Sequence, residues 1–175
     1  MFVSASPTSP DDIIRMIVDA VRRHLEAGER EELWFAAAVN GLVTFHASTA
    51  AGERPSSEST AALRDAARWL LHDNRIAMSL YALTIDNFAL RAARDGWLQA
   101  CVGRSALQYL VDDFPDLLVN SVLEPEYLLD IDIELREAAP EVSPPPAEMI
   151  PPGTPRSHWW WWAPSAAGDW SVSVV

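Results

Sequence analysis

Seven prolines between residues 140 and 155 set the limit of regular structure in this chain. Proline has no backbone N–H and a fixed φ, so such a run interrupts helices and central strands and favours extended conformations. The residues before the prolines have the mixed apolar and charged pattern of a folded domain. The sequence therefore predicts an acidic globular domain over 1–139, a Pro-rich linker over 140–156 and a Trp-rich C-terminal tail over 157–175.

Negative charge is concentrated in one part of the chain. The net charge is −12, and residues 105–150 hold eleven carboxylates but a single arginine. Such a balance argues against nucleic acid as a partner, because phosphate binding rests on Lys and Arg. All 13 basic residues are Arg, and together with the abundant Ala this is typical of a protein from a high-GC bacterial genome.

Cysteine usage and hydropathy bear on the compartment. Cys101 is the only cysteine, so the sequence predicts no disulfide framework and a small buried side chain at this position. The first ten residues lack the pattern of a signal peptide, and no uncharged apolar run is long enough to span a bilayer. We expect a cytoplasmic protein without a transmembrane segment, and the sequence does not indicate its oligomeric state.

Helical periodicity dominates the first 123 residues. Ser9-Pro10-Asp11-Asp12 is typical of a helix start, with a capping serine, a proline at the first position and carboxylates in the first turn. The periodicity predicts helices from Pro10 to Gly28, Ser59 or Thr60 to Asp73, Arg75 to Asp95, Arg104 to Asp113, and Asp116 to Leu123. The stretch from Arg75 also fits a strand to Ile85 followed by a helix.

Two segments favour strands. Asn40-Gly41 lies between two apolar runs in Leu33–His46, which indicates a β-hairpin, although three consecutive alanines leave a helix broken at Gly41 open. Apolar and acidic residues alternate strictly in Tyr127–Leu135, which predicts a half-buried strand. Together these patterns predict a helix-rich α+β fold with a short antiparallel hairpin and one late strand, with an all-α fold as the alternative.

The alternating segment also supplies a candidate binding site. In a strand, Asp130, Asp132 and Glu134 would form a row of carboxylates on one face. Such a row presents negative charge to a basic protein partner or shares a divalent cation, and it is also the pattern of a solvated edge strand. We assign no metal site, because no phosphate-binding loop or lysine accompanies the row.

No arrangement of residues in the sequence is typical of catalysis. The four histidines do not occur in metal-binding pairs, and His24 and His72 fit positions near helix C-termini. Ser105 with His72 and Asp73 forms a conceivable nucleophilic set, but no nucleophile-elbow motif surrounds the serine. We therefore predict no catalytic residue and no cofactor, and regard an enzyme as the less favoured class.

The tail concentrates tryptophan beyond the prolines. Four adjacent indoles cannot all face one core in a helix or strand, so we expect at least one to be exposed or to meet another surface. The tail is compatible with folding back on its own domain, docking on a partner protein, resting weakly at a membrane interface, or serving as substrate of a modifying enzyme. Its candidate contact residues are Trp159, Trp160, Trp161, Trp162, Trp170 and Val175.

Together, the acidic domain and the Trp-rich tail predict a non-enzymatic interaction or adaptor protein. Its partner contacts are the tail and the acidic region over residues 105–150. One alternative is a ribosomal peptide precursor whose Trp-rich core is modified by a partner enzyme. Another is an acidic immunity or inhibitor protein for a basic toxin, for which binding would be tight and sensitive to salt.

Overall fold

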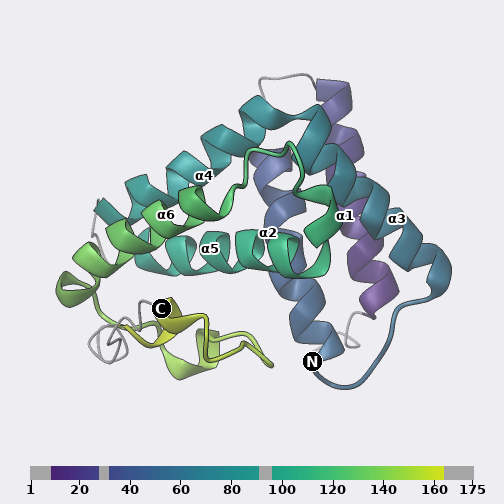
Figure 1. Ribbon diagram of the computed structural model, residues 1–175. Helices are drawn as coiled ribbons and strands as arrows, with labels where there is room; N and C mark the ends of the chain where they lie inside the picture. The colour runs from purple at the N-terminus through teal and green to yellow at the C-terminus, as the bar shows by residue number, and fades with distance from the viewer. Residues whose placement is uncertain (1–8, 28–31, 91–95, 164–175) are drawn as a thin grey trace.

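A computed structural model describes residues 9–27, 32–90 and 96–163 (Figure 1). Every regular element in these ranges is a helix, and no strand occurs among them. The predicted α+β class is therefore wrong, and the fold is all-α. The six α-helices are α1 (Pro10–Ala27), α2 (Glu32–Thr49), α3 (Ser57–Arg68), α4 (Arg75–Leu90), α5 (Gly96–Asp113) and α6 (Pro125–Ala138).

The predicted hairpin at Leu33–His46 is helix α2 instead. Gly41 lies where α2 crosses α1, and a Cβ atom built there would stand only 2.6 Å from Cγ1 of Ile17. The side chain of Asn40 accepts a hydrogen bond from the Tyr81 hydroxyl at 2.5 Å. Asn-Gly is therefore used for close helix packing and a polar contact inside a continuous helix, not for a turn.

The predicted strand at Tyr127–Leu135 is also wrong, because these residues lie in α6. Pro125 begins this helix at a position where its missing N–H costs nothing. In a helix, alternate residues point to opposite sides, so Ile131 and Leu135 are buried while Leu129 and Ile133 are exposed. The three carboxylates of the predicted acidic row therefore do not share one face.

The other expected helices are confirmed with shifted ends, but the helix predicted from Asp116 to Leu123 is wrong. Ser9 caps α1 by accepting a hydrogen bond from the Asp12 amide at 3.2 Å, and α4 is one helix rather than a strand and a helix. Ser56, not Ser59, caps α3. Trp69–Asp73 continues α3 as a π-helical turn. The segment after Pro115 forms only a short 3-10 turn, Pro115–Leu117.

The helices form two groups joined through α2 and α5. α1 packs against α2 and α3, and α4 packs against α5 and α6, while α2 also contacts α5 (Figure 1). Gly103 permits close approach of α5 to α4, since a Cβ atom there would lie 2.9 Å from Ile85. α5 is central to the core, with Trp97, Cys101 and Leu107 buried.

After α6 the chain forms only short 3-10 turns up to Ala163: Ala139–Glu141, Ala147–Met149 and Trp159–Trp162. The last of these turns contacts α5, as Figure 1 shows. The division into domain, linker and tail stays a prediction. Among the described residues, no helix combines the length and apolar character required to cross a membrane.

Candidate functional site

The 3-10 turn Trp159–Trp162, which we call the tryptophan turn, is enclosed by the helices rather than extended from them. Trp159, Trp160 and Trp161 are each at most 3% exposed, and Trp162 is half-buried. A 3-10 turn directs successive side chains about 120° apart, so neighbouring indoles reach different surfaces. Three adjacent indoles therefore join one core, which the geometry of a regular helix or strand did not lead us to expect.

Ser105 on α5 holds this turn in place. Its Oγ accepts hydrogen bonds from Nε1 of Trp160 at 3.0 Å and from Nε1 of Trp161 at 2.8 Å, and it lies 3.0 Å from Nδ1 of His158. With both lone pairs taken by the indoles, the hydroxyl has its proton left to donate to His158. We name Ser105, His158, Trp160 and Trp161 the serine clasp.

The backbone of the same turn is also bound by α5. The carbonyl oxygen of Trp160 accepts a hydrogen bond from Nε1 of Trp97 at 3.1 Å and another from the thiol of Cys101 at 3.4 Å. Burial raises the pKa of that thiol well above its usual range, so it stays protonated and able to donate. Cys101 is thus a buried structural residue, as the sequence indicated.

Ser105 and His158 resemble a nucleophile and its base in distance only. Burial, followed by the nearby Arg104 charge, lowers the pKa of His158 to about 4, so the ring is neutral at pH 7. Its Nε2 is buried without a hydrogen-bond partner among the described residues, so nothing orients the ring as a third catalytic group would. Ser105 is itself only 1% exposed, so the clasp is a structural contact.

Arginines cover the outer sides of the tryptophan turn. The guanidinium carbon of Arg104 lies 4.7 Å from the centre of the Trp160 ring, that of Arg136 lies 5.4 Å from Trp159, and that of Arg156 lies 4.4 Å from Trp162. Cations over aromatic faces are attracted by the ring quadrupole. The contacts of Arg104 and Arg136 connect the turn to α5 and α6, whereas Arg156 comes from the segment that precedes the turn.

The predicted acidic residues have separate environments on α6. Asp132 forms a bidentate ion pair with the buried Arg104, with oxygen–nitrogen distances of 2.7 and 3.1 Å. Asp130 is exposed on the opposite side of the helix, and Glu134 is half-buried. Asp132 thus links α6 to α5, and of the three it has the clearest structural role.

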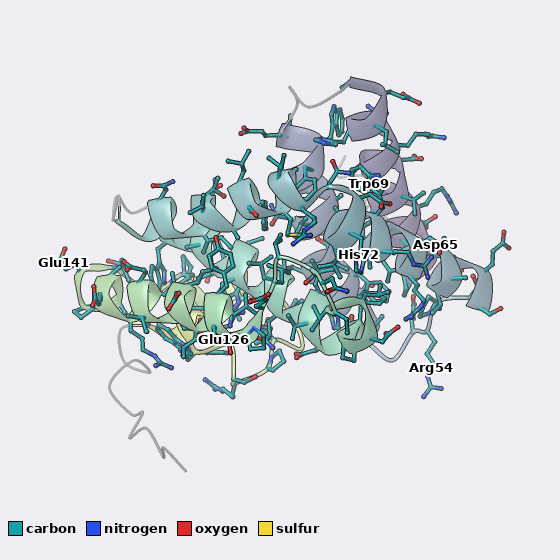
Figure 2. The ribbon with its side chains drawn as sticks, turned by 45° about the horizontal axis from the view of Figure 1, so that its top comes forward. Arg54, Asp65, Trp69, His72, Glu126 and Glu141 are labelled. Atoms are coloured by element: carbon teal, nitrogen blue, oxygen red, sulfur yellow. The ribbon has the colours of Figure 1, made fainter. Side chains whose placement is uncertain are left out.

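The solvent side of α6 combines exposed apolar and acidic side chains. Leu129 is 54% exposed and Ile133 is 44% exposed, one helical turn apart. The exposed carboxylates nearest them along this side are Glu126, Asp130 and Glu137. Figure 2 shows Glu126 and Glu141 toward opposite ends of this region. We call Glu126, Leu129, Asp130, Ile133 and Glu137 the α6 outer face.

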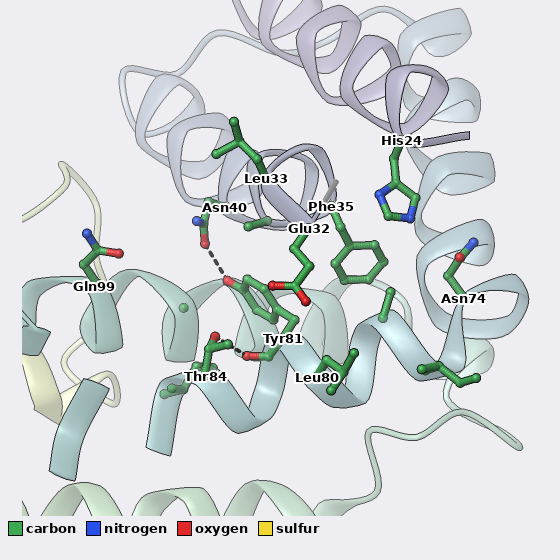
Figure 3. Close-up of a pocket in the computed structure, with 15 residues that line it drawn as sticks. His24, Glu32, Leu33, Phe35, Asn40, Asn74, Leu80, Tyr81, Thr84 and Gln99 are labelled. Carbon is green, nitrogen blue, oxygen red and sulfur yellow. Dashed lines mark hydrogen bonds between the residues drawn. The ribbon is translucent and has the colours of Figure 1, made fainter. Parts of the chain in front are cut away.

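A separate cleft lies between α2 and α4 (Figure 3), with a volume of about 430 Å³. Its buried floor includes Phe35 and Tyr81, and its rim includes Leu33, Ile76 and Leu80, which are 73%, 75% and 47% exposed. A volume of this size fits a small organic ligand. No sequence pattern indicated this site, because its residues come from four separate segments of the chain.

The remaining predictions concern residues that the structure does not bring together or does not describe. His72 and Asp73 lie in the π-helical turn, whereas Ser105 is bound by the tryptophan turn. Trp170 and Val175 lie outside the described residues. Within the described part, no group of three or more His, Cys, Asp and Glu side chains is arranged to hold a metal ion.

Comparison of the chain with protein-family models, with curated proteins and with solved structures gives no match. The function is therefore inferred from the side chains and surfaces described above.

Proposed function

We propose that this chain is a cytoplasmic, non-enzymatic interaction protein that binds a basic, amphipathic segment of a partner protein on the α6 outer face. The observation that carries the proposal is the exposure of Leu129 and Ile133 among carboxylates. α6 already fills the core with Leu128, Ile131 and Leu135, so its second apolar side has no use in packing the helices.

The chemistry of the α6 outer face selects its partner. Two large aliphatic side chains one turn apart suit the apolar stripe of an amphipathic helix. The surrounding carboxylates favour Lys or Arg at the edges of that stripe and repel acidic sequences. Burying the exposed parts of Leu129 and Ile133 contributes about 1 kcal/mol each.

The acidic stretch that contains α6 supports the same charge preference. Residues 105–150 carry a single arginine, and only three of their carboxylates are held in the ion pairs seen among the described residues: Asp113 with His46, Asp116 with Arg64 and Asp132 with Arg104. An inhibitor of a basic toxin is one protein of this kind, since its binding is strongly electrostatic.

The test uses two synthetic helical peptides with the same leucine stripe, one with lysine and one with glutamate at the flanking positions. We expect the lysine peptide to shift the backbone NMR signals of Glu126–Glu137 in the full chain and to bind more weakly as salt increases. Binding of the glutamate peptide with equal affinity, or shifts elsewhere on the protein, would refute the proposal.

The matched variants are the double change Leu129→Ser with Ile133→Ser and the control Leu83→Ser. Leu83 is 48% exposed on α4, so its replacement removes about as much apolar surface at another place as one of the two changes on α6 does. We expect the double variant to bind the lysine peptide at least tenfold more weakly, because about 2 kcal/mol of apolar burial is lost. Equal weakening by the control would show that the contact is not specific to α6.

A further inference from the structure

The cleft between α2 and α4 is independent of the α6 outer face and has its own chemical character. Its floor contains the aromatic rings of Phe35 and Tyr81, and its open side exposes Leu33 and Ile76. Both side chains are about three-quarters exposed, so an apolar molecule bound beside them would remove their surface from water, which is favourable.

The hydroxyl groups of the cleft are occupied by hydrogen bonds within it. The Tyr81 hydroxyl donates to Oδ1 of Asn40, and the Thr84 hydroxyl donates to the Tyr81 carbonyl at 2.6 Å (Figure 3). Burial raises the pKa of Tyr81 well above its usual range, so the phenol stays neutral. The interior of the cleft therefore favours the uncharged part of a ligand.

Glu32 gives the cleft its charge. It projects from the start of α2 toward the space in front of Tyr81 (Figure 3), and no ion pair joins it to another described residue. Among the described residues no arginine lines the cleft, and His24, the one basic side chain of its lining, lies with its ring edge-on to Phe35 and Trp69. The net charge of −12 further disfavours an anion.

We propose that this cleft binds a small hydrophobic amine, with its apolar body over Phe35 and Tyr81 and its ammonium group beside Glu32. Aromatic faces attract cations as well as apolar groups, so the aromatic floor favours both the apolar body and the ammonium end of such a ligand. A carboxylic acid with the same body would place its charge against Glu32 without a compensating cation.

The experiment compares phenylbutylamine, phenylbutanol and phenylbutyrate, which share one body and differ in the charged or neutral end group. Binding to the full chain is followed by methyl NMR signals of Ala36, Ala77 and Leu80 in the cleft, with Leu129 as a distant reference. We expect the amine to bind most tightly, the alcohol next and the carboxylate most weakly, with shifts confined to the cleft.

Two variants separate a ligand contact from an effect on the helix. Glu32→Gln removes the carboxylate in the first turn of α2, and Glu58→Gln makes the same change in the first turn of α3, away from the cleft. We expect Glu32→Gln to weaken the amine about fivefold and to leave the alcohol unchanged, the size of a part-exposed charge pair. Glu58→Gln should change neither.

Three results would overturn the proposal. The first is equal affinity for the amine and the carboxylate. The second is equal weakening of all three probes by Glu32→Gln, which would mean that the residue acts on the helix alone. The third is the absence of shifts at the cleft methyl groups with millimolar amine.

Discussion

The tryptophan turn and the α6 outer face look alike in the sequence but differ in their partners within the fold. Both place apolar side chains where the linear pattern indicates a contact with another molecule. The turn has complementary groups on α5, where Ser105 and Trp97 bind its polar atoms. The α6 outer face leaves Leu129 and Ile133 exposed. The two regions therefore differ in whether the helices cover the apolar side chains, as they do for Trp159, Trp160 and Trp161 but not for Leu129 and Ile133.

The largest expected difference between the two regions concerns removal of an apolar side chain. Trp160→Ala should lower the free energy of unfolding by about 3–5 kcal/mol, because the indole is fully buried. Leu129→Ala should change it by less than about 0.5 kcal/mol, because half of this side chain already faces water. Urea unfolding measures both values, and similar losses would break the comparison.

Two aspartates two residues apart on α6 provide a sharper contrast. Asp132→Asn should cost about 3 kcal/mol, because it leaves the buried guanidinium of Arg104 without its counter-charge. Asp130→Asn, the same change on the exposed side, should be nearly neutral for stability. Equal effects in thermal unfolding would contradict the assignment of opposite roles to these carboxylates.

Ser105→Ala tests the hydrogen bonds of the serine clasp without removing an indole. It leaves two buried indole N–H groups without an acceptor, so we expect a loss of about 2 kcal/mol in the free energy of unfolding. Ser143→Ala, at an exposed serine, is the matched control. A loss no larger than that of the control would show that the indoles do not depend on this hydroxyl.

The smallest expected effect is a dependence of stability on pH through His158. Its pKa is about 4 in the fold against an ordinary value of 6.5, so the unfolded chain binds the proton more readily. The contribution of the neutral His158 ring to the free energy of unfolding is complete above pH 6.5 and is lost as the pH falls from 6.5 through 4. After allowance for solvent screening, we expect about 1 kcal/mol more loss between pH 7 and pH 5 than in His158→Gln. Urea unfolding at each pH measures the free energies, and an equal fall with pH in the two proteins would contradict this expectation.

The helices that the sequence predicted well are those with local signals. α1 and α3 have amphipathic periodicity, and Ser9 caps α1 as predicted, because such signals act within about one helical turn. The errors came from residues whose role depends on a distant element. Gly41 serves contact with Ile17, and the alternation in α6 serves two different surfaces. A local pattern cannot distinguish these uses from a turn or a strand.

Of the proposed functional features, the acidic charge and the tryptophans could be recognised in the sequence, but their arrangement could not. Ser105 and His158 are 53 residues apart, and Arg104 and Asp132 are 28 residues apart. No rule of sequence spacing predicts contacts between residues so far apart from a single sequence. The cleft has no motif at all, because its floor is built from α2 and α4, which are far apart in the sequence.

The most direct test of this account compares two shortened chains by thermal unfolding, one ending at Ala163 and one ending at Ser157. They differ only in the six residues of the tryptophan turn and its flanks. We predict that the shorter chain unfolds at least about 10 °C lower, as a loss of several kcal/mol requires in a protein of this size. Equal unfolding temperatures would contradict the claim that the tryptophan turn belongs to the folded body.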